Sequence, residues 1–286
     1  MFQFSRLSIL ILAGWTAING FPIHAQIAVD DKALASLDAE MRNLVSSEQV
    51  ANASYGLWQH GELIAEGYFG PVSASNPAPV SDTTIHRIYS MTKPVTAIGM
   101  LILMERGAFS LDDPITKILP EFEGTEVLAD YDADGKMYTY RPSAPPTIRQ
   151  LLSHTAGFAY GNHTNSFLDR RMLEMKIMDE ATSSDLIDSL STLPYARAPG
   201  AEWQYSIASD LQGAMIERIT GESLDAFLSR ELFEPLGMND TGFFVDDDQL
   251  NRVSGVTYHN SYGLSYDTLK PATLEAQSQT FFEGGA

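Results

Sequence analysis

Residues 90–104 decide the fold, and they read Ser90-Met91-Thr92-Lys93 followed by the apolar run Pro94-Val95-Thr96-Ala97-Ile98-Gly99-Met100-Leu101-Ile102-Leu103-Met104. A serine three residues before a lysine places a hydroxyl and an amine on one face of a helical turn. A serine hydroxyl becomes a nucleophile when a base takes its proton, and a lysine amine kept out of water is one such base. Many S-x-x-K patterns lie on solvated helix surfaces. This is the chain's one copy, however, and the apolar run that follows it would bury the start of the helix. We expect a helix over residues 90–106 that presents Ser90 and Lys93 together.

Composition limits the classes of function. The chain has 286 residues, 44% of them apolar, as in a globular protein with one large core or two modest ones. Its net charge of −19 disfavours nucleic acid and anionic lipid surfaces as partners. The chain has no cysteine, which excludes disulfides and thiolate metal sites.

The first 25 residues have the pattern of a secretory signal. Arg6 precedes an apolar stretch over residues 7–17, and Ala25 ends a cleavage pattern before Gln26. A membrane anchor is the alternative, but the apolar stretch is too short to span a bilayer. We expect a periplasmic or secreted protein with no stable membrane span.

Hydrophobic periodicity and turn residues predict the element order. Helices are expected over residues 29–50, 90–106, 147–157, 167–178, 183–193 and 211–220, with a further short helix from residue 111. Hairpins are expected over residues 54–69 and 126–140. The predicted division is a signal (1–25), the N-terminal part of an α/β domain (26–80), a mostly helical domain (81–280), and the start of a C-terminal α/β segment (281–286).

Two local patterns suggest chemistry more weakly. The D-x-D-x-D-G run over residues 130–135 resembles the start of a calcium loop, but Arg141 stands where the bidentate glutamate belongs, so an Asp-Gly turn is favoured. His154 lies near a predicted helix end, and no Ser-His-Asp order or G-x-S-x-G elbow accompanies it, so packing is favoured over a chemical role.

A second constellation lies before the predicted helix 211–220, where Tyr205-Ser206 follows a Pro199-Gly200 break. With it, residues 80–245 resemble the serine hydrolases of the class C β-lactamase and penicillin-binding-protein-like superfamily, and within it the family VIII carboxylesterases. The similar stretches are Ile88-Tyr89-Ser90-Met91-Thr92-Lys93-Pro94, Leu111-Asp112-Asp113-Pro114, Ile148-Arg149-Gln150-Leu151-Leu152-Ser153-His154-Thr155-Ala156-Gly157, Tyr205-Ser206, Asp210-Leu211 and Glu234-Pro235-Leu236-Gly237-Met238.

The resemblance implies an α+β fold of the serine β-lactamase/transpeptidase type, with an antiparallel sheet flanked by helices and a mostly helical domain. It implies that Ser90 is acylated, that Lys93 shares in proton transfer, and that Tyr205 relays the proton. Tyr89 and Ile207 are expected to contact the substrate. No metal or organic cofactor is expected.

The chain departs from the family pattern at two places. Ile207 stands where β-lactamases of this type carry an asparagine that binds the amide of the antibiotic, which favours an ester substrate. The third family motif, K-T-G, H-x-G or W-x-G, is absent from a suitable place, so we expect a truncated sequence whose sheet and oxyanion hole are incomplete and which shows little or no turnover by itself.

These observations favour a serine hydrolase that acts on carboxylic esters through an acyl-enzyme. A β-lactamase or D-Ala-D-Ala carboxypeptidase is one alternative, and a non-catalytic binding protein of the same fold is another. The expected partner is a small ester or β-lactam substrate. The sequence leaves the acyl chain length and the oligomeric state open.

Overall fold

A computed structural model describes residues 30–161, 164–179, 182–260 and 263–266. The chain divides into two compact units, one built from residues up to Thr83 together with Thr257–Tyr266, the other containing Thr84–Val256. The predicted helical segment 81–280 therefore includes residues that belong to the first unit. The predicted signal, residues 1–25, and the segment 281–286 lie outside the described residues.

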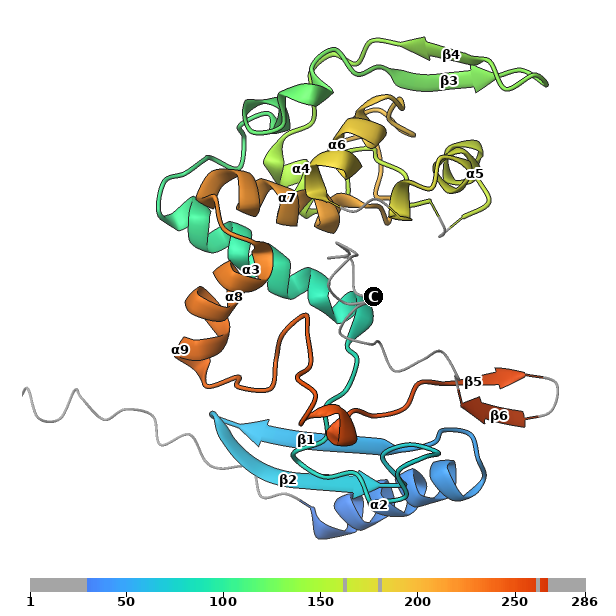
Figure 1. Ribbon diagram of the computed structural model, residues 1–286, viewed down its shortest axis with the longest axis vertical. Helices are drawn as coiled ribbons and strands as arrows, with labels where there is room; N and C mark the ends of the chain where they lie inside the picture. Colours follow the sequence, from blue (N-terminus) through green and yellow to red (C-terminus); the bar gives the residue numbers. More distant parts are fainter. Residues whose placement is uncertain (1–29, 162–163, 180–181, 261–262, 267–286) are drawn as a thin grey trace, which may run out of the picture. The chain divides into compact units, whose positions relative to one another are not determined.

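The first unit contains a helix and a hairpin, as predicted. Helix α2 (Asp31–Ser46) begins after Asp30, whose carboxylate accepts the backbone N–H of Lys32 at 2.9 Å. Strands β1 (Ala53–Gln59) and β2 (Glu62–Phe69) pair antiparallel and meet at His60 and Gly61, which have φ of 52° and 84°. Positive φ at both turn positions matches the right-handed twist of a hairpin. Helix α2 packs against this hairpin (Figure 1).

The same unit includes a hairpin that the sequence analysis did not predict. Strands β5 (Thr257–Asn260) and β6 (Gly263–Tyr266) pair antiparallel. Within the described residues the strands form three two-stranded antiparallel sheets, β1–β2, β3–β4 and β5–β6. This mixture of helices and antiparallel strands agrees with the predicted α+β class.

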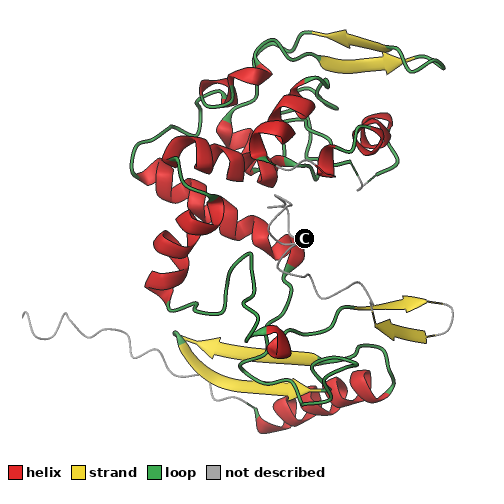
Figure 2. Ribbon diagram, viewed as in Figure 1, coloured by secondary structure: helices red, strands yellow, loops and turns green. Residues whose placement is uncertain are grey.

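Helices dominate the second unit (Figure 2). Its α-helices are α3 (Thr92–Glu105), α4 (Ile148–Leu152), α5 (Phe167–Glu174), α6 (Ser183–Ser191), α7 (Ala208–Thr220), α8 (Leu224–Leu228) and α9 (Glu234–Leu236). Its short 3-10 segments are Tyr89–Met91, Ile115–Lys117, Pro120–Phe122, Ile177–Asp179 and Leu250–Arg252, and a π-helical turn covers Ser229–Phe233. The hairpin of β3 (Val127–Tyr131) and β4 (Met137–Tyr140) confirms the predicted strands of residues 126–140.

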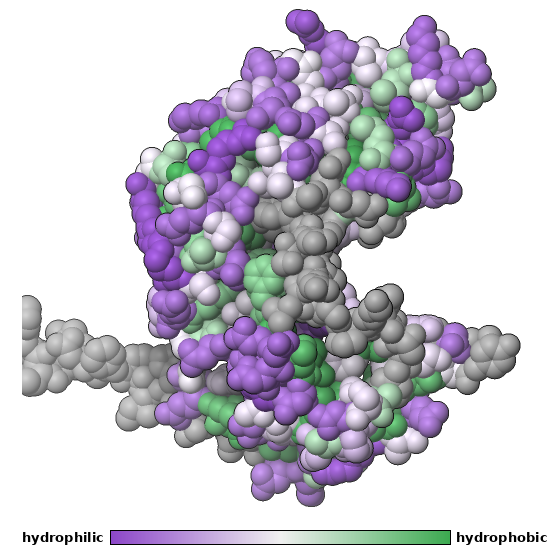
Figure 3. Space-filling model, in the orientation of Figure 1, coloured by the Kyte–Doolittle hydropathy of each residue, from purple (hydrophilic) through white to green (hydrophobic). Residues whose placement is uncertain are grey.

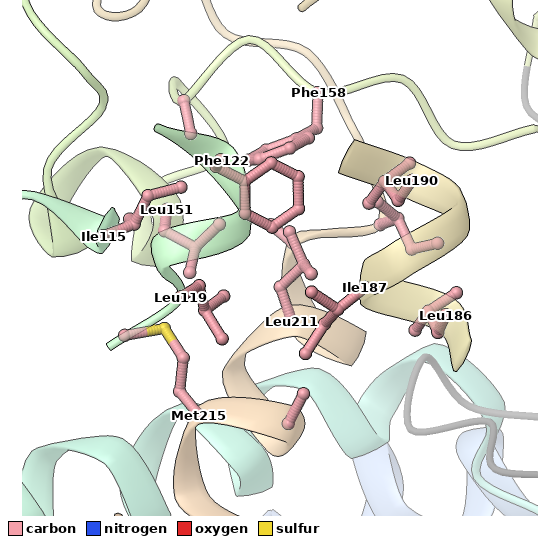
Figure 4. Close-up of a cluster of buried hydrophobic side chains, with 14 of the residues drawn as sticks. Ile115, Leu119, Phe122, Leu151, Phe158, Leu186, Ile187, Leu190, Leu211 and Met215 are labelled. Atoms are coloured by element: carbon pink, nitrogen blue, oxygen red, sulfur yellow. The ribbon is translucent and has the colours of Figure 1, made fainter. Parts of the chain in front are cut away.

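A continuous apolar core holds the second unit together. Helix α3 packs against α7 and α8 at Gly99, where an added Cβ would lie 3.0 Å from the side chains of Ile216 and Leu228. The described core lies between α4, α6, α7 and the 3-10 segments (Figure 4). The side chains labelled there are all buried: Ile115, Leu119, Phe122, Leu151, Phe158, Leu186, Ile187, Leu190, Leu211 and Met215.

Two predicted elements differ from the structure in detail. Ser90 lies on the 3-10 turn Tyr89–Met91, and the α-helix begins at Thr92, so the serine precedes the helix. The segment after residue 111 forms the 3-10 turn Ile115–Lys117 instead of an α-helix. The first backbone N–H groups of an α-helix and of a 3-10 turn have no partner within the helix, so a proline at the start fits both and does not distinguish them.

The acidic run over residues 130–135 covers the end of β3 and the turn that follows it, and the turn agrees with the interpretation favoured from the sequence. One oxygen of Asp132 accepts the backbone N–H groups of Asp134 and Lys136 at 3.1 and 3.0 Å, and Gly135 has a φ of 79°. The Asp132 carboxylate thus closes its own loop.

Hydrophilic residues cover much of the visible surface (Figure 3), consistent with the acidic composition. Among the described residues, no helix combines the length and hydropathy needed to cross a bilayer.

Candidate active site

Ser90 is held at a strained junction at the start of α3. Tyr89 has a φ of 43°, in the left-handed region that side chains other than glycine adopt rarely, at a cost of order 1–3 kcal/mol. The segment before it is anchored, because Ile85 exchanges backbone hydrogen bonds of 2.9 and 2.8 Å with Arg252 and Ser254. The turn leaves the Ser90 side chain exposed. A serine that is both anchored and exposed can reach a substrate.

Lys93 lies one turn further along, on the buried face of α3. Its side chain is 8% exposed, and its Nζ lies 3.4 Å from Ser90 Oγ. The same Nζ lies 4.9 Å from the ring centre of Tyr205 and 5.4 Å from that of Tyr160. Two aromatic rings therefore surround an ammonium group beside the serine, an arrangement stabilised by cation–π attraction.

Tyr205 reaches the serine from a distant part of the chain. Its hydroxyl donates to Ser90 Oγ at 2.8 Å. The loop that carries it is fixed by backbone hydrogen bonds from Gly200 to the Thr155 carbonyl at 2.7 Å and from Gln204 to the His154 carbonyl at 2.9 Å. Helix α7 begins at Ala208, just after this loop. The structure thus brings together Ser90, Lys93 and Tyr205 within hydrogen-bonding or near-contact distance.

A second tyrosine, Tyr160, borders the site and was not predicted from the sequence. The Tyr160 ring packs edge-on against Tyr205, with centroids 5.2 Å apart. Burial, with the nearby negative charge of Asp210 and the Tyr205 phenol, raises the pKa of Tyr160 to about 12. Tyr160 therefore stays a neutral phenol at physiological pH. No sequence signal marks it, because its contact with Tyr205 depends on the tertiary fold.

His154 also joins the site, next to Tyr205. The two rings stack with centroids 5.3 Å apart and planes 14° apart. Burial, and then the positive charge of Lys93, lower the pKa of His154 below the usual histidine range. A neutral imidazole therefore packs against the tyrosine, in agreement with the packing role that the sequence pattern favoured.

Tyr89 and Ile207, the two predicted substrate contacts, lie in contrasting environments. Tyr89 is 44% exposed beside Ser90, so its ring is accessible. Ile207 is fully buried within the apolar core, and its backbone N–H donates to the Ala159 carbonyl at 3.1 Å. The Ile207 side chain thus packs in the core, and its expected contact with a substrate stays a prediction. Its position at the N-terminus of α7 turns the side chain inward.

The described residues include no cluster of three or more His, Cys, Asp or Glu side chains placed to hold a metal ion. The groups gathered at Ser90 are a hydroxyl, an amine, two phenols and an imidazole. Such a set can move protons and form an ester with a substrate acyl group.

Comparison with known proteins identifies the family of this chain. The family described as Beta-lactamase matches residues 37–269. Esterase EstB of Burkholderia gladioli is 32% identical over 217 residues, which cover 73% of this chain and 51% of EstB. This similarity confirms the resemblance inferred from the motifs.

Solved structures agree. Simvastatin synthase (LovD) from Aspergillus terreus superposes with a TM-score of 0.75 at 29% identity, over 90% of this chain and 64% of that one. EstCE1, described as a hydrolase with promiscuous acyltransferase activity, gives a TM-score of 0.72 at 25% identity, over 90% and 68% of the two chains. The chain spans about half the length of the curated relatives it matches.

Proposed function

Because the chain belongs to the Beta-lactamase family, we propose that it is a serine acyl hydrolase that cleaves carboxylic esters through an acyl-enzyme on Ser90. The observation that carries this proposal is the hydrogen bond of 2.8 Å between the Tyr205 hydroxyl and Ser90 Oγ, with Lys93 Nζ at 3.4 Å. Nucleophile and proton acceptor lie within direct transfer distance, which is the geometric requirement for an activated serine.

In the proposed acylation step, Ser90 Oγ attacks the ester carbonyl carbon while its proton passes to the Tyr205 oxygen. This oxygen is therefore a phenolate before the step and a neutral phenol after it, and the Lys93 ammonium, near both groups, offsets the charge of the phenolate. The backbone N–H of Ser90 is proposed as one donor to the tetrahedral oxyanion. The proton then goes to the departing alkoxide, which leaves as an alcohol.

Deacylation reverses these roles. Water attacks the acyl-enzyme carbonyl and loses its proton toward the Tyr205 oxygen, and the proton returns to Ser90 Oγ as the carboxylic acid leaves. Tyr160 lies close enough to pack on Tyr205, but its raised pKa keeps it protonated. Its part in the proposal is to pack on Tyr205, not to accept the proton.

Ester substrates are supported by the named activity of the relative EstB and by the apolar, buried residue at position 207. A β-lactam or D-Ala-D-Ala peptide remains the alternative substrate. A second candidate function is acyl transfer to an alcohol, which is favoured by the acyltransferase activity named for EstCE1. An acyl-enzyme yields either product, depending on whether water or an alcohol attacks it.

Steady-state kinetics of the whole protein on short-acyl nitrophenyl esters and on a cephalosporin test this proposal. We expect ester turnover that disappears in Ser90→Ala and persists in Ser184→Ala, because Ser184 is an exposed serine on α6 away from Lys93 and Tyr205. Cephalosporin turnover without ester cleavage would contradict the ester assignment. A second alcohol added to the ester assay would reveal acyl transfer as a new ester product.

We also propose that the protein is exported, on the basis of the signal pattern over residues 1–25. N-terminal sequencing of the protein recovered outside the cytoplasm should then begin at Gln26. An intact N-terminus in cytoplasmic protein would contradict export.

A further inference from the structure

His154 occupies an unusual backbone position at the end of α4. Its φ of 55° is left-handed, a conformation in which histidine is several-fold enriched among non-glycine residues. This turn points the His154 carbonyl at the Gln204 N–H, 2.9 Å away, and the neighbouring Thr155 carbonyl accepts the Gly200 N–H at 2.7 Å. The backbone around His154 is therefore joined to the loop that carries Tyr205.

The imidazole adds a side-chain connection to the same loop. Its Nδ1 accepts the Ser206 backbone N–H at 3.3 Å and lies 3.1 Å from Ser206 Oγ. Because a backbone N–H can only donate, Nδ1 must carry its lone pair, and the ring proton sits on Nε2. The bond is thus made by the neutral imidazole and would be lost on protonation.

The ring face then determines where the phenol can lie. It stacks on Tyr205 with 14° between the planes, while Trp203 packs edge-on against the imidazole with centroids 6.3 Å apart. A phenol in contact with this plane cannot rotate away from Ser90 without breaking the stack. Aromatic contacts of this kind contribute roughly 0.5–1.5 kcal/mol beyond the area they bury.

We propose that His154 is a positioning residue, which holds the Tyr205 phenol toward Ser90 through its ring stack and its bond to Ser206, and does so in the neutral form. This inference rests on the proposed function, because it assigns to Tyr205 a role in proton transfer. The titratable groups that face His154 are Lys93 from α3 and Tyr205 itself. The burial and Lys93 charge that lower the pKa of His154 preserve the neutral form near pH 7.

Two variants remove the imidazole without straining the backbone. Asparagine and glycine both tolerate the left-handed conformation, so His154→Asn and His154→Gly keep the local fold. His60 has a φ of 52° in the β1–β2 turn, so His60→Asn is a matched control in the other unit. Thermal unfolding of each variant shows whether it is folded.

The first measurement is the rate at which a fluorophosphonate labels Ser90, followed by mass spectrometry of the full chain. We expect His154→Asn to slow labelling by between about 10-fold and 100-fold, since a misplaced reactive group costs up to about 100-fold. Free imidazole should restore part of the rate in His154→Gly. The wild-type rate should fall at a pH below the ordinary histidine pKa, and His154→Asn should lack that step. Labelling of folded His154→Asn at the wild-type rate would overturn the inference.

The second measurement does not depend on activity. In protein labelled with 3-fluorotyrosine, Tyr205→Phe identifies the Tyr205 fluorine resonance, which we expect to shift in His154→Asn and to stay fixed in His60→Asn. If wild-type Ser90 is never labelled, the proposed function fails, and this resonance alone decides the positioning role. An unchanged Tyr205 resonance in His154→Asn would refute it.

Discussion

Replacing Asp169 with asparagine should lower the free energy of unfolding by about 2–4 kcal/mol. The carboxylate is 1% exposed on α5, and described residues donate hydrogen bonds to both of its oxygens. One oxygen accepts the backbone N–H groups of Tyr160 and Gly161 at 3.2 and 2.8 Å. The other accepts the Thr164 N–H at 3.2 Å and the Thr164 hydroxyl. This carboxylate thus fixes the backbone of the tyrosine that packs on Tyr205.

The magnitude follows from the geometry of the substitution. An asparagine in the same pose keeps one oxygen, but its NH₂ group meets the Thr164 N–H, which loses its acceptor. A buried donor without a partner costs about 1–3 kcal/mol. The two bonds that remain change from charge-assisted to neutral and lose about half their strength, on the order of 1 kcal/mol.

The pH dependence of the unfolding free energy gives a second, independent test. Burial acts to raise the pKa of Asp169, but the hydrogen bonds from Thr164 and Gly161 and further donors outweigh it and hold the pKa below the usual aspartate range. A carboxylate with a lowered pKa in the folded state stabilises the fold above its unfolded pKa of about 3.9, and that stabilisation disappears as the pH falls through the folded value. The difference between wild type and Asp169→Asn should be constant from about pH 5 to 7 and should shrink below about pH 4.

Urea unfolding followed by far-UV circular dichroism measures both effects. Asp134→Asn makes the same change at an exposed carboxylate and should alter stability by no more than about 0.5 kcal/mol. If Asp169→Asn matches this control, or if its deficit is the same at pH 3.5 and pH 7, the reasoning is wrong.

Three further predictions concern the site and its supports. Tyr205→Phe and Lys93→Met should each lower the rate of Ser90 acylation by about 100-fold to 10,000-fold in stopped-flow ester assays, while substrate binding changes little. Unchanged acylation would exclude these groups from proton transfer. Gly157→Ala should destabilise the fold by more than about 2 kcal/mol in urea, because the new Cβ would lie 2.1 Å from the Arg197 carbonyl oxygen at a φ of 91°; wild-type stability would show that the loop yields. Ile207→Asn should lower thermal stability, at a cost of about 2–4 kcal/mol, because it buries an amide in the apolar core; a stable variant would place residue 207 at an open surface.

The sequence predicted those parts of the fold that depend on local patterns. The β1–β2 hairpin was predicted from its turn residues, and α7 was predicted from its apolar spacing and from Gly221, whose φ of 74° ends the helix. The β5–β6 hairpin was not predicted, and neither was its membership in the first unit, which depends on tertiary contacts far apart in the sequence.

The residues of the candidate site were likewise predicted only in part. The sequence pointed to Ser90, Lys93 and Tyr205 through their motifs, and the structure brings these three side chains together. The sequence could not identify Tyr160, since only tertiary packing places that ring against Tyr205. It favoured a packing role for His154 without revealing that the packing partner is Tyr205.

The central claim is that Ser90 is the acylated residue. Peptide mapping by mass spectrometry after treatment with a fluorophosphonate tests it most directly. We predict one phosphonyl adduct on the peptide that carries Ser90, formed more slowly in Tyr205→Phe and absent in Ser90→Ala. An adduct on another serine, or an unmodified Ser90 in the folded protein, would contradict the claim and favour a binding protein of the same fold.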